Sequence, residues 1–529
     1  MTEPLVLLAA TLVLAAIGIL PVAAMLKQTL IADGRFSLDA YRALLASSDH
    51  LVLLMSHSLE LGFLTAALST LIGVPLGVVL GKTDLPWRGA LTLVLAAPLA
   101  IPAYVLAVAW LPILARTGLL GGFLPDAWSR EIGSAFFGLF GCTFVFTSAF
   151  MPIAMLLTIA FLRNVNPQLE NAGRLVSGWP GVLAHITLPL VAPAIAFAAV
   201  LIFLLSLGEI GVPMYLRFPV YPVETLTQFA AFYDLRAATV AAAPLLLVTL
   251  AVLGLQTRLH KRVLQLGRRT PRGEAVQIAL GVWRMPLFVL VLAFAAIAVA
   301  LPLGALAAQS LSVETYAQAL ARAGDSIVRS FAFAAIGASL LAVLGFFLGY
   351  LAERKTLFLW WTNEWIALLL LALPGSVIGI GLISLWNTKA TSLIYASPAI
   401  LILGYLAQYA ILPMRVAAAS LHAVPYALEQ AAWLSGAGWI ATLRWIVAPL
   451  ARRGLLAAWL ISFVFALRDV AISIVVYPPG ADTLPIRILT LMANGAPSLI
   501  AALCIFLIAV TLLPLAAAGV WLKFDAARP

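Results

Sequence analysis

Charged residues are scarce in this sequence. Of its 529 residues, 31 are Lys or Arg and 21 are Asp or Glu, so only 10% are charged, whereas 64% are hydrophobic. Soluble domains carry about 25% charged residues, because a charged surface keeps them dissolved. The shortage of charge therefore excludes a soluble fold.

Cysteine and histidine are also scarce, and no nucleotide-binding loop is present. Cys142 and Cys504 both lie in apolar stretches, and the five histidines show no metal-ligand spacing, so we expect no disulfide framework, metal site or catalytic centre. The pattern GxxxxGK[ST] does not occur: Gly81-Lys82 comes nearest, but Leu76 stands where the first glycine belongs. We therefore expect a protein that is not an enzyme, carries no cofactor and does not itself bind ATP.

Long apolar runs dominate the chain instead, and each membrane-spanning helix needs about 20 such residues. Strands of a membrane barrel would alternate polar and apolar residues, which these runs do not. The pattern predicts an all-α polytopic membrane protein with twelve spans, near residues 4–26, 56–80, 90–115, 136–162, 190–214, 236–257, 285–309, 328–352, 364–386, 397–420, 450–476 and 497–522.

The formal net charge of +10 reflects membrane topology rather than a nucleic-acid partner. The longest basic cluster runs from Arg258 to Arg272 between two apolar spans, without interleaved aromatic residues. Placing the N-terminus inside puts most Lys and Arg residues on the cytoplasmic side, as multi-pass proteins require. We therefore predict that both termini are cytoplasmic and that the first apolar run is a retained helix, because no basic segment precedes it.

The two halves of the chain repeat each other. A shift of 272 places Ser58 on Ser330, Gly73 on Gly345 and Pro102 on Pro374, and a shift of 260 applies after the third span of each half. Each half has six spans, an even number, so both copies keep the same orientation in the membrane. We predict two parallel repeats, residues 1–270 and 271–529.

The most similar segments of the two copies are loops at 164–189 and 424–449, on the predicted cytoplasmic side. The first reads Glu170-Asn-Ala-Gly-Arg-Leu-Val-Ser-Gly178-Trp179 and later Ile186-Thr-Leu-Pro189, and the second reads Gln430-Ala-Ala-Trp-Leu-Ser-Gly436-Ala-Gly438-Trp439 and later Ile446-Val-Ala-Pro449. Each predicts a short helix that Gly178 or Gly438 ends in a left-handed conformation, and a proline that begins the next span.

These loops resemble the EAA loop of ABC importer permeases, and the fused form with two such loops is similar to iron(III) and thiamine transport permeases. In the second copy Gln430 replaces the motif's glutamate, although Glu429 precedes it. The alternative is a pair of amphipathic helices that lie on the lipid surface.

The resemblance implies that each loop docks one of two ABC ATPase subunits, and that a substrate-binding protein delivers cargo outside the bacterial inner membrane. The positions that it implies for docking are Glu170, Ala172, Gly178, Trp179, Pro189, Gln430, Ala432, Gly436, Gly438, Trp439 and Pro449.

Two acidic residues occupy matched positions near the outer ends of spans 5 and 11, since Glu209 falls on Asp469 at the shift of 260. Charge inside a span is costly and often lines a cavity. We therefore predict that Glu209 and Asp469 line the translocation path. The alternatives are an ion pair, with Arg468 beside Asp469, or capping of helix ends.

The outer segments 219–226 and 477–484 also resemble each other. We expect them to face a substrate-delivery protein, and the alternative is that they are simple rigid loops. The tract from Tyr477 to Arg487 resembles the corresponding segment of ferric-iron permeases, which favours iron(III) as cargo over thiamine, phosphonate or polyamine. A transporter driven by an ion gradient is the alternative of another class, because parallel six-span repeats occur there too.

Overall fold

The computed structural model describes residues 2–32, 35–39, 41–42, 48–115, 118–123, 125–230, 235–267, 276–357 and 360–526. Helices make up nearly all of the described structure, and β1 (Ile31–Ala32) and β2 (Arg35–Phe36) form a small antiparallel pair. The predicted all-α polytopic class is confirmed.

Twelve stretches of the described chain are long and apolar enough to cross a membrane. Eight are unbroken: Glu3–Leu30, Asp49–Lys82, Leu139–Leu162, Trp179–Gly208, Arg236–Leu255, Gly281–Gln309, Val313–Arg354 and Pro497–Trp521. Four more are pairs of helices bent by more than 40°: Arg88–Ala100 with Ala103–Leu114, Trp360–Ala372 with Gly375–Trp386, Ala399–Tyr409 with Ile411–His422, and Trp439–Leu450 with Arg452–Leu467. If each pair is one span, each of the twelve predicted spans overlaps one of these stretches.

The chain divides into two compact units. Unit 1 comprises Met1–Ser48, Glu224–Leu246 and Val313–Pro529, and unit 2 comprises Asp49–Val223 and Leu247–Ser312. The helices of unit 1 are α1 (Thr2–Leu14), η1 (Ala15–Ile19), α2 (Leu20–Leu30), α17 (Val313–Arg354), α18 (Trp360–Ala372), α19 (Gly375–Trp386), α20 (Ser392–Tyr395), α21 (Ala399–Tyr409), α22 (Ile411–His422), α23 (Tyr426–Leu434), α24 (Trp439–Thr442), η6 (Leu443–Val447), α25 (Ala448–Leu450), α26 (Arg452–Leu467), α27 (Ser473–Val476), α28 (Leu484–Asn494) and α29 (Pro497–Ala526).

Unit 2 holds α4 (Ser48–Lys82) apart from its first residue, α5 (Arg88–Ala100), α6 (Ala103–Leu114), η2 (Leu120–Gly122), α7 (Asp126–Phe136), α8 (Leu139–Leu162), α9 (Pro167–Arg174), α10 (Trp179–Val182), η3 (Leu183–Thr187), α11 (Leu188–Gly208), α12 (Gly211–Tyr215), η4 (Gly281–Trp283), α15 (Arg284–Ala295), η5 (Ala296–Ala300) and α16 (Leu301–Gln309). The division crosses α13 (Tyr221–Ala230) and falls within α14 (Leu235–Gly267).

These units differ from the predicted repeats 1–270 and 271–529, because the first helix of each repeat packs with the other repeat's helices. In unit 1, Asn363 donates to the Thr11 hydroxyl at 3.0 Å, and Gln28 donates to the Ser384 carbonyl at 3.0 Å. The predicted boundary at 270/271 lies outside the described residues. Sequence similarity marks the repeats, whereas contacts between distant residues define the compact units.

Residues 278–284, in the segment between the repeats, are bound to the end of α4 and to Asp84 by hydrogen bonds. Ile278 donates to the Lys82 carbonyl at 2.7 Å, and the Leu280 amide donates to the Asp84 carboxylate at 3.0 Å. Arg284 also donates to the Asp84 carbonyl. These bonds place the segment beside the end of α4, which explains why α15 belongs to unit 2.

Two of the predicted spans, near 90–115 and 364–386, are sharply bent. The axis turns by 103° between α5 and α6 and by 109° between α18 and α19. Pro102 and Pro374 stand directly before the second helix of each pair. Proline has no amide donor and disfavours a helical conformation in the residue before it, so the helix is interrupted there.

Four helical runs each contain one π-helical turn followed by proline. The turns η1, η3, η5 and η6 each end two residues before a proline, at Pro21, Pro189, Pro302 and Pro449. A wider turn accommodates a residue that cannot donate to the preceding turn. The prediction that Pro189 and Pro449 begin spans is therefore wrong, since the helical runs begin at Trp179 and Trp439.

Candidate docking loops and path residues

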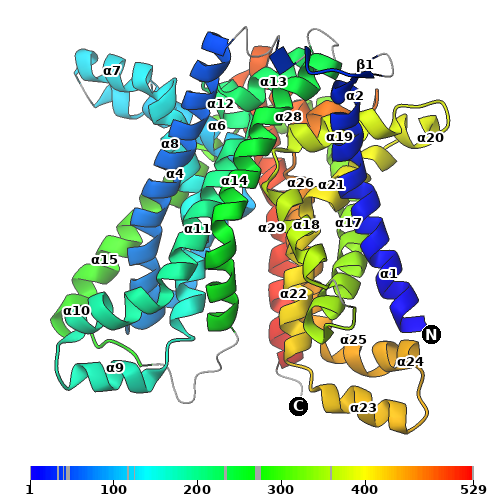
Figure 1. The fold of residues 1–529 in the computed structure, drawn as a ribbon. Coiled ribbons are helices and arrows are strands. Elements are labelled where there is room, and N and C mark those ends of the chain that lie inside the picture. The colour runs from blue at the N-terminus through cyan, green and yellow to red at the C-terminus, as the bar shows by residue number, and fades with distance from the viewer. Residues whose placement is uncertain are drawn as a thin grey trace. The chain divides into compact units, whose positions relative to one another are not determined.

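The first loop, residues 164–189, contains α9, a turn and α10. Asn166 caps α9, because its side-chain oxygen accepts the Gln168 amide at 3.0 Å, which is a favoured use of asparagine at a helix start. Within unit 2, α9 and α10 lie at one end of the long helices, and α7 and α12 lie at the other (Figure 1).

The second loop, residues 424–449, repeats this arrangement in unit 1 with α23 and α24. The N-terminus lies at the same end of unit 1 as α23 and α24, whereas β1 and α20 lie at the opposite end (Figure 1). Leu7 of α1 joins Trp439 and Leu443 in one apolar cluster. The first helix therefore supports the second loop directly.

The loop glycines differ from the prediction in their conformation. Gly178 (φ −68°, ψ 172°) and Gly438 (φ −72°, ψ 159°) are extended, and each is the residue that precedes α10 or α24. Gly436 takes the left-handed conformation instead, with φ +84°. At the shift of 260 its counterpart is Val176, and a β-branched residue disfavours that conformation, so the first loop turns without it.

Glu170 is fully buried and ion-paired. Its carboxylate accepts the Lys82 ammonium at 2.6 Å and the Thr187 hydroxyl at 2.9 Å. Lys82 is the last residue of α4 and Thr187 is the last residue of η3. The side chain of Glu170 thus holds the loop to the span ends in this structure and does not face outward.

In the second loop the buried carboxylate belongs to Glu429, whereas Gln430 is exposed. Glu429 is ion-paired with Arg354 at 2.5 Å and accepts the Tyr350 hydroxyl at 2.8 Å. The buried carboxylate of the second loop therefore stands one residue before Gln430, the position that the shift of 260 aligns with Glu170. Glu429 precedes Gln430 in the printed sequence, so the signal was present.

The loop tryptophans pack differently in the two copies. Trp179 is half-buried, with the Arg174 guanidinium 4.8 Å from its ring centroid. Trp439 is buried, and its indole nitrogen donates to the Tyr350 hydroxyl at 3.3 Å. The remaining predicted docking residues are mostly on the surface: Ala172, Pro189, Gly436 and Pro449 are exposed, and Ala432 is buried.

The most exposed apolar side chains of the loops were missed from sequence. Leu175 and Val176 are 89% and 91% exposed after α9, and Leu434 is 91% exposed at the end of α23. We call these three residues the loop tips. The repeat offers no signal for them, because at the shift of 260 Leu175 and Val176 fall on Ser435 and Gly436, and Leu434 falls on Arg174.

Glu209 and Asp469 lie just beyond the ends of α11 and α26, where the helical runs break. The Glu209 carboxylate accepts the Gly211 amide at 3.0 Å. Asp469 is buried, and its carboxylate accepts the Ser473 amide (2.9 Å), the Ser473 hydroxyl (2.7 Å) and the Tyr409 hydroxyl (2.8 Å). These contacts bind each carboxylate to the first residue of the next short helix, α12 or α27, whereas a role in the translocation path stays a prediction.

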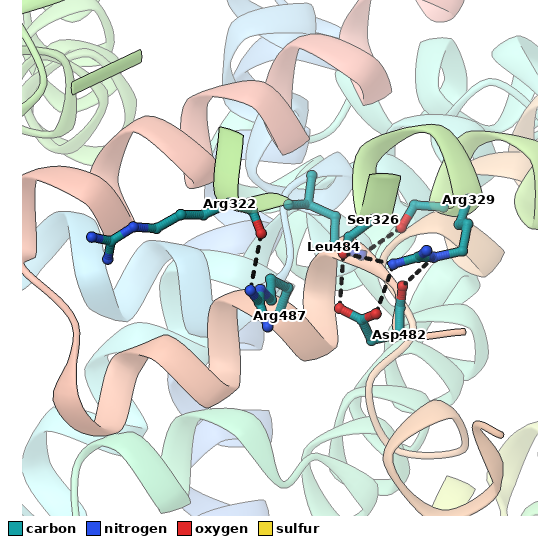
Figure 2. Close-up of polar contacts among 7 residues, drawn as sticks. Arg322, Ser326, Arg329, Asp482, Leu484 and Arg487 are labelled. Carbon is teal, nitrogen blue, oxygen red and sulfur yellow. Dashed lines mark hydrogen bonds and ion pairs between the residues drawn. The ribbon is translucent and has the colours of Figure 1, made fainter. Parts of the chain in front are cut away.

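The tract from Tyr477 to Arg487 is fastened to α17 (Figure 2). Asp482 pairs with Arg329 at 2.7 Å and accepts the Ser326 hydroxyl at 2.8 Å. The Leu484 amide donates to the Ser330 hydroxyl at 2.6 Å. In unit 2, Ser58 accepts the Tyr221 amide at 2.8 Å, so a serine holds the first residue of the following helix in both copies.

No group of three or more His, Cys, Asp and Glu side chains lies close enough to hold a metal ion among the residues that the structure describes. The two cysteines are buried and not bonded to each other.

Comparison with known proteins agrees with this architecture. Residues 73–265 match the family described as "Binding-protein-dependent transport system inner membrane component". The matched part of the chain is therefore similar to inner membrane components of binding-protein-dependent transport systems, and the candidate spans indicate a multi-pass membrane protein. The matched segment, which includes the first loop, is a domain of that family.

Similar curated proteins are also transport permeases. The chain is 25% identical over 466 residues to the putative ferric transport system permease protein FbpB 1 of Haemophilus influenzae, which covers 84% of this chain and 72% of that protein. It is 24% identical over 457 residues to the ferric transport system permease protein FbpB of Actinobacillus pleuropneumoniae, covering 82% of this chain and 66% of that protein. It is 31% identical over 159 residues to the molybdenum transport system permease protein ModB of Mycobacterium tuberculosis, covering 29% and 59%.

Proposed function

We propose that this chain is the membrane subunit of an ATP-driven importer, in which each loop binds one of two ATPase subunits. The observation that carries the proposal is the pair of loops at matched positions. Each loop has a strongly exposed apolar tip at the end of its first helix, α9 or α23. The glutamate of that helix, Glu170 or Glu429, is buried and ion-paired. Hydrolysis of ATP belongs to the partner subunits, because the chain has no nucleotide-binding loop.

The loop tips have the chemistry of a protein contact. Leu175, Val176 and Leu434 expose apolar surface at the ends of the loops, and burying one such side chain contributes about 1.5–3 kcal/mol. A lipid-facing amphipathic helix is the alternative, and an ATPase bound to the loops in detergent solution would argue against it.

Both loops and both termini are proposed to lie in the cytoplasm. The excess of Lys and Arg on the predicted cytoplasmic side of the spans supports this orientation. In unit 1, α1 begins at the end that holds α23 and α24 (Figure 1). A membrane-impermeant thiol reagent should therefore label Leu175→Cys in inverted vesicles and not in intact cells. Labelling in intact cells would reverse the orientation.

The proposed cargo is ferric iron, delivered by a substrate-binding protein on the outer side. Its support is the likeness of most of the chain to two ferric transport permeases and the tract from Tyr477 to Arg487. Phosphonate, molybdate, thiamine and polyamine are the competing cargoes. Because a separate binding protein would select the cargo, the residues of the spans need not recognise it.

Reconstitution tests the proposal as a whole. The purified chain, its ATPase and its binding protein in proteoliposomes should take up ferric iron when ATP is supplied on the ATPase side, and should not do so without ATP. Uptake by the chain alone on an ion gradient would instead establish a secondary transporter.

Docking is tested by the double variant Gly178→Asp and Gly438→Asp. Both glycines are exposed and extended, a new Cβ meets at most ordinary contacts there, and aspartate is a favoured residue before a helix. The fold should survive while the ATPase is lost from the complex. Gly89→Asp is the matched control, since Gly89 is exposed outside the loops and has nothing within 4 Å of a new Cβ. Equal ATPase binding by the unaltered chain, the double variant and Gly89→Asp would refute docking.

A further inference from the structure

The two loops share one buried polar arrangement, and it links each loop to a long helix. Glu170 and Glu429 are both fully buried, and each is paired with the last residue of a long helix, Lys82 of α4 or Arg354 of α17. Lys82 and Arg354 are 272 residues apart, the shift that superposes the spans containing them. The repeat therefore preserves the cation at the same structural position.

Each carboxylate also accepts one hydroxyl, but from different positions in the two copies. Thr187 supplies it in the first copy and Tyr350 in the second. The counterpart of Thr187 is Val447, and the counterpart of Tyr350 is Val78, neither of which can donate. The shared feature is thus a buried, ion-paired carboxylate that accepts one hydroxyl, rather than a repeated hydroxyl side chain.

Burial makes these pairs strong constraints on the loops. A buried carboxylate without its partner is costly, and the penalty disappears only while the cation and the hydrogen bonds remain in place. Lys82 is 88 residues from Glu170 in the chain, so the ion pair joins the loop to a helix that the backbone does not connect to it directly. A displacement of the loop therefore pulls on the end of α4, and in the second copy on the end of α17.

We propose that Lys82 and Arg354 are positioning residues that make each docking loop move as one body with α4 or α17. They would carry the displacement that an ATPase imposes at the loop tips into the membrane spans. This inference rests on the proposed function, because it concerns the force applied by a bound ATPase. The buried glutamates would then transmit the motion without touching the ATPase in this state.

Loop mobility tests the anchoring on the permease alone. A spin label at Leu175→Cys or Leu434→Cys reports each tip, since both sites are about nine-tenths exposed and the native cysteines are buried. Lys82→Met should increase the label's mobility at residue 175 and leave residue 434 unchanged. Arg354→Met should do the reverse.

Two controls accompany these variants. Lys82→Arg keeps the charge and should restore the order of the first loop, while Arg284→Met removes a half-exposed partner of Asp84 nearby and should change neither tip. Unchanged mobility at residue 175 in Lys82→Met would overturn the anchoring.

Coupling is measured in proteoliposomes with the ATPase and binding protein. In Lys82→Met the ATPase should remain bound and hydrolyse ATP, while substrate transported per ATP falls by about tenfold, within the usual range of coupling between sites. If ATPase binding, ATP hydrolysis and transport instead fall together, with the substrate transported per ATP unchanged, Lys82 has only a structural role. That result would overturn the proposal that Lys82 transmits the motion of the loop. If the unaltered chain binds no ATPase, the proposed function fails, whereas the spin-label result still decides the anchoring.

Discussion

A methyl group added at Gly345 tests how closely the spans pack in unit 1. Gly345 faces α22, and a Cβ built there would lie 2.6 Å from the Pro413 Cβ and 2.8 Å from the Met414 amide nitrogen. Both are well inside ordinary van der Waals contact, and neither atom is the end of a flexible side chain. Gly345→Ala therefore requires α17 and α22 to separate.

The expected cost follows from a comparison with Gly324→Ala in the same helix, where nothing lies within 4 Å of the new Cβ. Both variants gain up to about 1 kcal/mol of helix propensity. Only Gly345→Ala incurs overpacking, at about 1–3 kcal/mol. The difference between the two free energies of unfolding thus isolates the packing cost, because the propensity gain cancels.

Denaturant titration of the two purified variants in detergent micelles measures this difference. Gly324→Ala should be at least as stable as the unaltered chain, and Gly345→Ala should be less stable than Gly324→Ala by the overpacking cost. Equal stability of the two variants would refute the close helix contact. The same reasoning applies to Gly73 in α4, whose new Cβ would lie 2.7 Å from the Met151 carbonyl oxygen.

Further expectations concern the polar contacts. Asp469→Ala should lower the free energy of unfolding by about 2–4 kcal/mol, because it removes the acceptor of the Ser473 amide and hydroxyl and leaves the Tyr409 hydroxyl unsatisfied. Asp469→Asn should cost less. Reduced uptake by both variants at unchanged stability would instead support the path role. Arg329→Ala should cost about 1–2 kcal/mol by breaking the partly buried contact with Asp482 (Figure 2). Arg322→Ala is its control, since the Arg322 side chain is exposed and the bond to Arg487 uses the Arg322 carbonyl, which the variant keeps. Equal effects of the two arginine variants in the same titration would contradict the assigned contacts.

The spans and the matched loops were predictable from the sequence because they depend on local composition. An apolar run of sufficient length predicts a membrane helix wherever it lies, and a repeated Gly-Trp with a later proline is visible without a structure. The predicted spans accordingly overlap the helical stretches one by one. Their bends were missed, since the chain is apolar on both sides of Pro102 and Pro374.

The pairing of the loop glutamates could not be read from the sequence in the same way. Glu170 and Lys82 are far apart in the chain, and nothing local in the motif says that the carboxylate is buried. The one-residue offset of Glu429 has the same origin, because alignment by identity favours Gln430 while the ion pair selects its neighbour. The exchange of first helices between the repeats likewise depends on contacts that only the folded chain contains.

The number of ATPase subunits bound per chain tests the central claim most directly. Native mass spectrometry of the purified complex should show two ATPase subunits on one permease chain, and either Leu175→Asp or Leu434→Asp should reduce this number to one. A complex that carries a single ATPase, or one that keeps both after either change, would contradict a permease with two equivalent docking loops.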